Sequence, residues 1–157
     1  MNDLKIIHAN ESHLDFLFTL ANDNLTRHFS FNQNTISYLD HSVWYKNKLS
    51  SKNDILYVCY DNNDLIGQIR FEIINELESV ISISILHKYR GLGYGSQILK
   101  LGCIDFWENY KITILAYVKK ININSYNLFL KNGFTLIENL NIKGDITYLL
   151  KKEYERN

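Results

Sequence analysis

The segment from Arg90 to Ser96 has residue types that could bind a phosphate group. Glycines occupy positions 91, 93 and 95, directly after a basic residue. Glycine allows positive φ and lets the backbone approach a ligand closely. The first amides of a following helix would have no partner inside that helix, and the helix dipole is positive at that end. We therefore expect this segment to hold a phosphate or pyrophosphate through backbone N–H groups.

The glycine spacing does not match two common nucleotide-binding loops. A P-loop has a lysine directly before its Ser or Thr, whereas Gly95 precedes Ser96 here. The dinucleotide-binding loop has the spacing Gly-x-Gly-x-x-Gly, whereas this chain has Gly-x-Gly-x-Gly. A tight strand-to-helix turn that binds nothing is the alternative that the segment alone leaves open.

The residues around this segment predict the strand and the helix that would position it. Before it, apolar residues alternate with serines over residues 79–86, as in a strand. After it, a helical pattern extends over residues 94–109. The residues of this helix that we expect to face the core are Ile98, Leu101, Ile104 and Trp107.

The whole chain predicts an α+β fold, with a mixed sheet of about seven strands and about four flanking helices. The expected strands are residues 4–9, 55–60, 65–74, 79–86, 111–118, 134–138 and 146–150. The expected helices are residues 14–20, a segment that begins after Asn34 or Thr35, residues 94–109 and residues 124–131. The second helix should bury Ile36, Leu39, Val43 and Leu49, and residues 26–31 should be irregular. This order gives a mostly antiparallel sheet with a crossover helix after the fourth strand.

Composition narrows the classes of function. The 157 residues fit a single domain, residues 1–157, with 46% apolar residues and 17 basic residues against 17 acidic ones. This charge balance argues against nucleic acid as a partner. The sequence has no apolar run of membrane-spanning length and no signal-peptide pattern, so we expect a cytoplasmic protein without a membrane partner. Cys59 and Cys103 lie in apolar patterns, which predicts buried thiols rather than a disulfide or a metal site.

A second motif follows the fifth expected strand. It reads Asn122-x-x-Ser125-x-x-Leu128-Phe129-x-Lys131-x-Gly133-Phe134. Together with Arg90-x-x-Gly93-x-Gly95, it resembles the GCN5-related N-acetyltransferases (GNAT), whose acetyl-CoA loop is Gln/Arg-x-x-Gly-x-Gly/Ala. The resemblance covers the second half of the chain. It implies the GNAT fold, in which the fourth and fifth strands splay apart, and acetyl-CoA as co-substrate with no metal.

The resemblance also implies a role for each part of the two motifs. Pantetheine would lie between the splayed strands and pair with the backbone of Ile83 and Ile85. The pyrophosphate would contact the loop amides, with added charge from its first residue. The loop residues are Arg90, Gly91, Leu92, Gly93, Tyr94, Gly95 and Ser96. Asn122 and Phe129 would lie along the pantetheine and the thiol, although Asn122 could instead be a turn residue and Ser96 an ordinary helix residue.

The implied reaction is direct attack of a neutral amine on the thioester in a ternary complex. A backbone amide of the fourth strand, near Ile85 or Leu86, would stabilise the oxyanion. The family's usual acid for the thiolate is a tyrosine at the position of Phe129, which cannot donate a proton, so Tyr126 is the candidate in its place. Glu72 is the candidate base, unless it only forms an exposed ion pair with a neighbouring arginine. His87 could relay a proton through water.

The first half of the chain bears on the acceptor amine. Three patterns there are similar to those of acetyltransferases that act on nucleotide-linked amino sugars in pseudaminic and related nonulosonic acid biosynthesis. They are Asn24-x-x-Arg27-x-x-Ser30, Ile36-Ser37-x-x-x-His41-x-x-Trp44-Tyr45-x-x-x-Leu49 and Ile66-Gly67-x-Ile69-Arg70-Phe71-Glu72. The similarity implies a small-molecule acceptor, a UDP-linked 4-amino-6-deoxy sugar, bound by Arg27, His41 and Trp44. His41 and Trp44 could instead simply pack together on one helix.

Two alternatives remain open. The same patterns are shared loosely with acetyltransferases of ribosomal-protein N-termini, so the acceptor could be a protein, a peptide or another small amine. The second alternative is a regulatory module that binds acyl-CoA without turnover, which Phe129 keeps open. A monomer and a homodimer are both compatible with the sequence.

Overall fold

A seven-stranded sheet forms the centre of the computed structural model, which describes residues 3–156. The strands are β1 (Leu4–His8), β2 (Asp54–Asp61), β3 (Asp64–Ile73), β4 (Glu78–Ile85), β5 (Thr113–Lys119), β6 (Thr135–Ile142) and β7 (Asp145–Lys152). Their order across the sheet is β1-β2-β3-β4-β5-β7-β6, and all neighbours are antiparallel except β4 and β5. The expected mixed, mostly antiparallel sheet is therefore confirmed.

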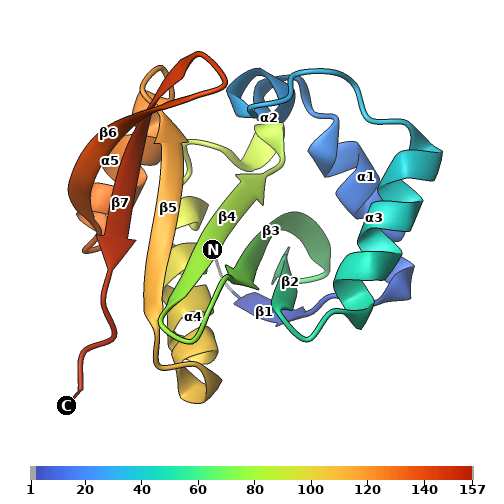
Figure 1. Ribbon diagram of the computed structural model, residues 1–157. Helices are drawn as coiled ribbons and strands as arrows, with labels where there is room; N and C mark the ends of the chain where they lie inside the picture. The colour runs from blue at the N-terminus through green and yellow to red at the C-terminus, as the bar shows by residue number, and fades with distance from the viewer. Residues whose placement is uncertain (1–2, 157) are drawn as a thin grey trace.

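Helices cover both faces of the sheet (Figure 1). They are α1 (Leu14–Ala21), α2 (Asn24–Phe29), α3 (Tyr38–Ser50), α4 (Tyr94–Asn109) and α5 (Ile123–Lys131). Helices α4 and α5 pack on one face, here called the α4 face, and α1 and α3 pack on the other, here called the α3 face. Within residues 3–156, no helix is long and apolar enough to cross a membrane.

The parallel strands β4 and β5 separate after a short contact. Residues 78–80 pair with residues 113–115. Beyond that point β4 stays paired with β3 up to Ile85, and β5 stays paired with β7 up to Lys119, but the two strands no longer pair with each other. A gap therefore opens between them, as the resemblance implied. Unpaired strand edges of this kind can accept an extended ligand as an additional strand.

Helix α4 packs on the sheet through a different stripe from the expected one. Ile98 is fully buried, but Leu101 and Ile104 are 37% and 61% exposed, so their predicted burial is wrong. The buried residues of α4 are Tyr94, Ile98, Leu99, Gly102, Cys103 and Phe106. The predicted residues are three positions apart, and because a helix has 3.6 residues per turn, such a series moves gradually around the helix. The observed buried residues are separated by one, three or four positions and so stay on one face. Gly102 belongs to that face because an added Cβ would lie 2.5 Å from Ile69.

Helix α3 buries polar aromatic side chains instead of the expected aliphatic ones. Leu39 and Val43 are 72% and 52% exposed, so the predicted apolar side is wrong. The buried residues are His41 and Tyr45, and the Tyr45 hydroxyl donates to the backbone oxygen of Asn10 at 2.5 Å. Tyr45 satisfies its hydroxyl in this way. The Nε2 of His41 is buried without a hydrogen-bond partner among residues 3–156, and aromatic rings surround the imidazole.

Residues 24–29 form the helix α2, although the sequence predicted an irregular segment. Asp23 begins this helix by accepting a hydrogen bond from the amide of Thr26 at 3.1 Å. The helix buries no residue completely, which explains why no apolar stripe revealed it.

The two cysteines are buried free thiols, as predicted. Burial raises the pKa of Cys59 and of Cys103 to about 12, so both stay protonated and unreactive at neutral pH.

Candidate active site

The glycine-rich loop presents open backbone at the start of α4. Gly93 is the N-cap residue with φ of 87°, and no side chain caps the helix. Gly91 also has positive φ, at 74°. Gly95 lies against α5, where an added Cβ would be 3.2 Å from Leu128. The loop therefore combines free helix-terminal amides with close packing, which suits a phosphate group.

Two tyrosines fix this loop to the β2–β3 hairpin. Tyr94 donates a short hydrogen bond to Asp61, and this bond raises the pKa of Tyr94 to about 12. Tyr89 donates to Asp64 at 3.4 Å, and the two tyrosine rings meet edge to face at 5.7 Å. The hairpin thus supports the loop from the side opposite to the gap between β4 and β5.

Arg90 connects the loop with β4 and with α2. Its Nε donates to the backbone oxygen of Ile85 at 2.8 Å. Its Nη2 donates to Asp23 at 2.6 Å and to the Thr26 hydroxyl at 3.2 Å. Burial alone would raise the pKa of Asp23, but hydrogen bonds from Thr26 and Arg90 hold that pKa below its usual value. A pyrophosphate at this loop would therefore share the guanidinium with an existing carboxylate partner.

Strand β4 points two backbone amides into the gap. The amide of Leu86 donates to Ile66 on β3 at 2.9 Å. Successive amides of a strand point to opposite edges, so those of Ile83 and Ile85 face away from β3 and toward the gap. Their side chains pack against the core of the α4 face. The amide of Ile85 therefore faces the gap, whereas the amide of Leu86 is bound to β3.

Asn122 and Ser96 both have structural partners. Asn122 caps α5 by accepting a hydrogen bond from the amide of Ser125 at 3.2 Å. The Ser96 hydroxyl accepts a hydrogen bond from Asn132 at 3.0 Å, which ties α4 to α5. Both residues therefore position the helices beside the gap, whatever they contribute to ligand binding.

The aromatic residues of α5 pack within the α4 face. Phe129 is 3% exposed, and its ring meets Phe134 edge to face at 4.9 Å. Tyr126 packs against Tyr148 of β7, with ring centroids 4.4 Å apart. The phenol of Tyr126 therefore belongs to the α5–β7 contact, on the side of β5 away from β4.

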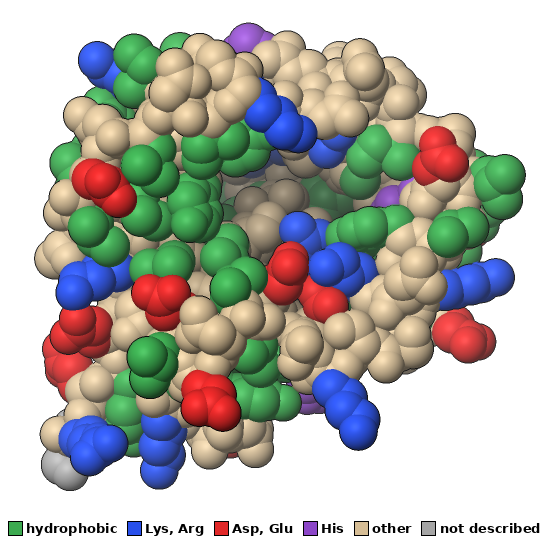
Figure 2. Space-filling model, viewed as in Figure 1, with side chains coloured by type: hydrophobic (Ala, Val, Ile, Leu, Met, Phe, Trp, Pro, Cys, Tyr) green, Lys and Arg blue, Asp and Glu red, His purple; other side chains and the backbone are tan. Residues whose placement is uncertain are grey.

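A hollow on the α3 face contains the polar cluster of the molecule. Figure 2 shows this hollow at the centre of the view, with Lys, Arg, Asp and Glu side chains at its edge. The guanidinium of Arg70 lies over the ring of Trp44, 5.0 Å from its centroid. Lys48 lies 2.8 Å from Asp54 and 3.4 Å from Glu72, whose side chain is 46% exposed. Two carboxylates, two cations and an indole thus form one polar cluster on this face.

The sequence and the fold both point to one family. A sequence model of the Acetyltransferase (GNAT) family matches residues 15–134. The chain belongs to this family. As a member of the GNAT family, the protein is an acetyltransferase whose co-substrate is acetyl-CoA. No curated protein matches the sequence significantly.

Several solved acetyltransferases share the fold. Spermidine N-acetyltransferase from Vibrio cholerae, in complex with CoA and spermine, has a TM-score of 0.86 and 17% identity, covering 96% of this chain and 95% of that one. Ribosomal-protein-alanine N-acetyltransferase from Brucella melitensis has a TM-score of 0.82 and 18% identity, covering 95% and 99%. An aminoglycoside acetyltransferase in complex with coenzyme A has a TM-score of 0.82 and 12% identity, covering 96% and 95%. At these identities the comparison establishes the fold.

The structure places the three residues expected to bind the acceptor in two regions. His41 and Trp44 pack against each other on α3, with ring centroids 5.6 Å apart, whereas Arg27 lies on α2. Trp44 reaches the hollow, where it contacts Arg70. His41 is 2% exposed and is enclosed by aromatic rings on α1 and α3, so its side chain lies inside that helix pair. Arg27 donates to the backbone oxygens of Ala21 at 2.6 Å and Asn32 at 2.8 Å. Arg27 therefore holds the ends of α1 and α2 in this structure.

The other expected catalytic side chains also lie apart. Glu72 projects into the hollow from β3, whereas His87 lies exposed on the 3-10 turn after β4. Among residues 3–156, no group of His, Cys, Asp and Glu could hold a metal ion.

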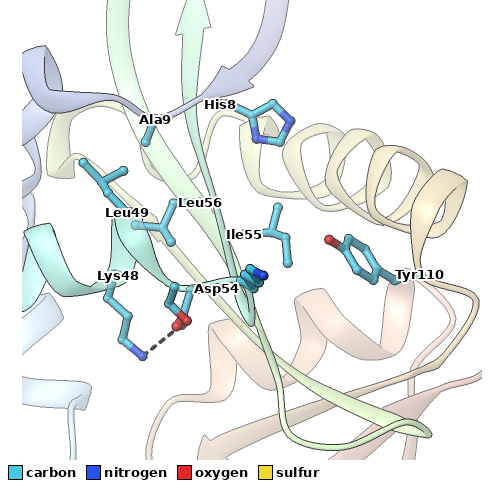
Figure 3. Close-up of a pocket in the computed structure, with 10 residues that line it drawn as sticks. His8, Ala9, Lys48, Leu49, Asp54, Ile55, Leu56 and Tyr110 are labelled. Atoms are coloured by element: carbon cyan, nitrogen blue, oxygen red, sulfur yellow. Dashed lines mark hydrogen bonds and ion pairs between the residues drawn. The ribbon is translucent and has the colours of Figure 1, made fainter.

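A separate pocket lies between α3 and β1. Its volume is about 270 Å³, and Figure 3 shows Lys48, Asp54, His8 and Tyr110 among the residues that line it. It shares Lys48 and Asp54 with the polar cluster of the hollow. Arg70, Trp44 and Glu72 are not among the residues that line it.

Two residues that the sequence did not single out also face the hollow side of the sheet. Lys119 ends β5, and Phe31 lies 5.5 Å from its Nζ. A lysine that ends a buried apolar strand is a weak signal by itself, because most lysines at strand ends are exposed.

Proposed function

We propose that this acetyltransferase acts on an amine whose carrier is negatively charged, namely the 4-amino group of a UDP-linked amino-deoxy sugar. Arg70 is the observation that supports this proposal. Burial lowers the pKa of Arg70, while the charges of Glu72 and Asp54 act in the opposite direction, and a guanidinium stays charged at neutral pH. Among residues 3–156 this guanidinium forms no hydrogen bond or ion pair. A guanidinium fixed over Trp44 and free of direct partners suits a phosphate of the acceptor.

The carboxylates of the hollow are already paired with protein cations. Lys48 contacts both Asp54 and Glu72. A site for a polyamine would need carboxylates that are free to bind the acceptor's ammonium groups. The pairing therefore favours an acceptor with negative charge over one with several positive charges.

We place acetyl-CoA on the loop and in the gap. The pyrophosphate binds the amides of residues 90–96, with Arg90 released in part from Asp23. The pantetheine extends along β4 and pairs with the backbone of Ile83 and Ile85. This placement brings the thioester to the edge of the hollow, where the acceptor enters from the α3 face. The residues 1–157 then form one acetyltransferase domain, and we expect it in the cytoplasm, where acetyl-CoA is available.

The proposed chemistry is direct transfer. The amine nitrogen attacks the thioester carbonyl carbon, the amide of Ile85 stabilises the oxyanion, and the C–S bond breaks as the tetrahedral intermediate collapses. Glu72 accepts the amine proton, directly or through one water molecule. The CoA thiolate takes its proton from water, because Phe129 cannot donate one and Tyr126 packs against Tyr148.

A protein, peptide or other small amine is the second candidate acceptor. It is supported by Glu72, whose 46% exposed carboxylate could also orient a cationic amine. The two candidates differ in what Arg70 should do. The positive charge of Arg70 should attract a phosphate-bearing acceptor, whereas it should repel a cationic acceptor.

Binding of nucleotide sugars to the CoA-loaded enzyme tests the proposal. We expect UDP-linked 4-amino sugars to raise the Tm of the CoA-saturated protein, and spermidine to leave it unchanged. Arg70→Met should abolish the shift, whereas Arg70→Lys should retain part of it. Stabilisation by CoA alone, with no response to any UDP-amino sugar, would sink the proposed acceptor class.

A further inference from the structure

Lys119 is a buried cation to which the reaction described above gives no role. The core side chains of β5 on the α4 face are Ile114, Ala116 and Val118. Side chains alternate along a strand, so Lys119 points to the α3 face, where the hollow lies. The last paired residues of β4 and β5 are Val80 and Leu115. Counting four residues further along each strand gives Ser84 on β4 and Lys119 on β5, where the two strands are no longer paired.

The ammonium group of Lys119 is enclosed and incompletely satisfied. The side chain is 1% exposed. Its Nζ lies 2.9 Å from Asp145, but without the geometry of a hydrogen bond, and it has no other polar partner among residues 3–156. An ammonium carries three N–H donors, and enclosing them without acceptors is costly. Asp145 is 37% exposed, so the pair is open to water on one side only.

The ring of Phe31 lies against the ammonium group of Lys119. The ring lies 5.5 Å from Nζ, in the segment between α2 and α3. The neighbouring residues are held at their backbone, where Arg27 donates to Asn32 at 2.8 Å and Asn22 donates to Ile36 at 2.9 Å. Neither hydrogen bond involves the ring of Phe31, so a rotation of the ring about its side-chain bonds would leave both intact.

We propose that Lys119 is a specificity-determining residue that binds a phosphate group of the acceptor when the ring of Phe31 turns aside. This inference rests on the proposed function. Arg70 on β3 and Lys119 on β5 face the same hollow from the two sides of β4, and Arg70 is level with Ser82, two residues from Ser84. Two cations in this arrangement can contact the two phosphates of a diphosphate.

The opposing interpretation is that Lys119 and Asp145 form only a structural ion pair. Two variants separate the interpretations, because they change anion binding in opposite directions. Lys119→Met removes the cation and keeps the length of the side chain. Asp145→Asn removes the competing carboxylate and leaves the cation free to bind an anion.

Calorimetric titration of the CoA-saturated enzyme with UDP and with inorganic pyrophosphate measures this difference. CoA fills the pyrophosphate loop, so the probe reports on the hollow alone. We expect Lys119→Met to weaken binding of both probes by about tenfold or more, Lys119→Arg to restore most of it, and Asp145→Asn to strengthen it by about two- to fivefold. The Tm of each variant is recorded separately, because both substitutions break the ion pair.

The outcomes also distinguish this inference from the proposed function. Pyrophosphate binding that depends on Lys119, without UDP binding, would keep the anion subsite and remove the nucleotide. UDP binding that is equal in wild type, Lys119→Met and Asp145→Asn, while the Tm falls in both variants, would overturn the inference. Binding of neither probe to the wild type would overturn it as well.

Discussion

At the scale of single residues, the structure separates side chains that face the hollow from side chains that build its walls. Glu72, Arg70 and Trp44 face it. Arg27 and His41 could also bind an anion by their chemistry, but they contact other residues of α1 and α3 instead. The reaction we propose therefore depends on one carboxylate of β3.

Glu72→Gln should lower kcat by about a hundredfold at pH 7, because an amide cannot accept the proton of the amine. Steady-state thiol release from acetyl-CoA measures this loss. Glu76→Gln, in the exposed β3–β4 turn, is the matched control and should change kcat by less than about twofold. A Glu72→Gln enzyme with wild-type kcat across the pH range would show that positioning of the amine is sufficient.

Phe129→Tyr should destabilise the protein without raising kcat. The residue is 3% exposed against Phe134, so a hydroxyl added there loses water and costs about 1–3 kcal/mol. Thermal unfolding should show a Tm lower by about 2–4 °C for each kcal/mol. Phe134→Tyr should behave similarly. A tenfold rise of kcat in Phe129→Tyr alone would contradict this, since it would mean that the hydroxyl reaches the thiolate.

The sequence could nominate residues but could not say where their side chains point. Arg27 was expected to meet an acceptor because arginine binds phosphates, but its donors are taken by the backbone oxygens of Ala21 and Asn32. Whether Arg27 bonds to these backbone oxygens or to a ligand depends on where α1 ends and on the path of the chain between α2 and α3. No local pattern contains that information.

At the scale of elements, the glycine-rich turn was the most predictable part of the site. The backbone features that favour phosphate binding, positive φ at Gly91 and Gly93 and an uncapped helix start, follow from the local sequence. The helix stripes were less predictable. In α4, Leu101 and Ile104 are exposed because the small residues Gly102 and Cys103 face the sheet instead.

Gly93→Ala should weaken acetyl-CoA binding by about tenfold or more, because the side chain projects from a loop that must approach the pyrophosphate. Gly144→Ala is the matched control, since Gly144 has the same φ of 87° but lies in the β6–β7 turn with open space around it. Both variants should lose stability to a similar degree. Equal CoA affinities of the two variants would argue against the loop as the pyrophosphate site.

At the scale of the whole molecule, the order of helices and strands was predictable, but the packing of α1, α2 and α3 beside the hollow was not. Alternating apolar residues and clear turns mark the strands, and the order of helices and strands then limits the sheet to few topologies. The short helix α2 and the buried face of α3 were missed, because Asp23, His41 and Tyr45 act there through caps and aromatic contacts rather than through aliphatic periodicity.

The stability of the whole protein should fall as the pH is lowered from 7.5 to 5.5. Burial lowers the pKa of His13 and of His41 below the value of about 6.5 that they have in the unfolded chain. Below that pH the unfolded state therefore binds more protons than the folded state, and stability is lost. The Tm should therefore be lower at pH 5.5 than at pH 7.5.

Variants at histidines identify the origin of this pH dependence. His41→Phe should reduce the drop in Tm, since phenylalanine can occupy the same aromatic surroundings without binding a proton. His87→Gln, on an exposed turn, should leave the drop unchanged. A Tm that is the same at both pH values in the wild type would contradict the assignment of His41 as a buried neutral residue.

The central claim is that the hollow on the α3 face selects an amine on a phosphate-bearing carrier. Steady-state acetyl transfer tests it most directly, with a UDP-linked 4-amino-deoxy sugar, the same amino sugar without UDP, and spermidine as acceptors. We predict a kcat/KM for the UDP-linked sugar that is about a hundredfold higher than for either of the others, because we propose that the guanidinium of Arg70, which lies over Trp44, binds the diphosphate. A higher kcat/KM for spermidine, or no transfer to the UDP-linked sugar, would contradict the claim.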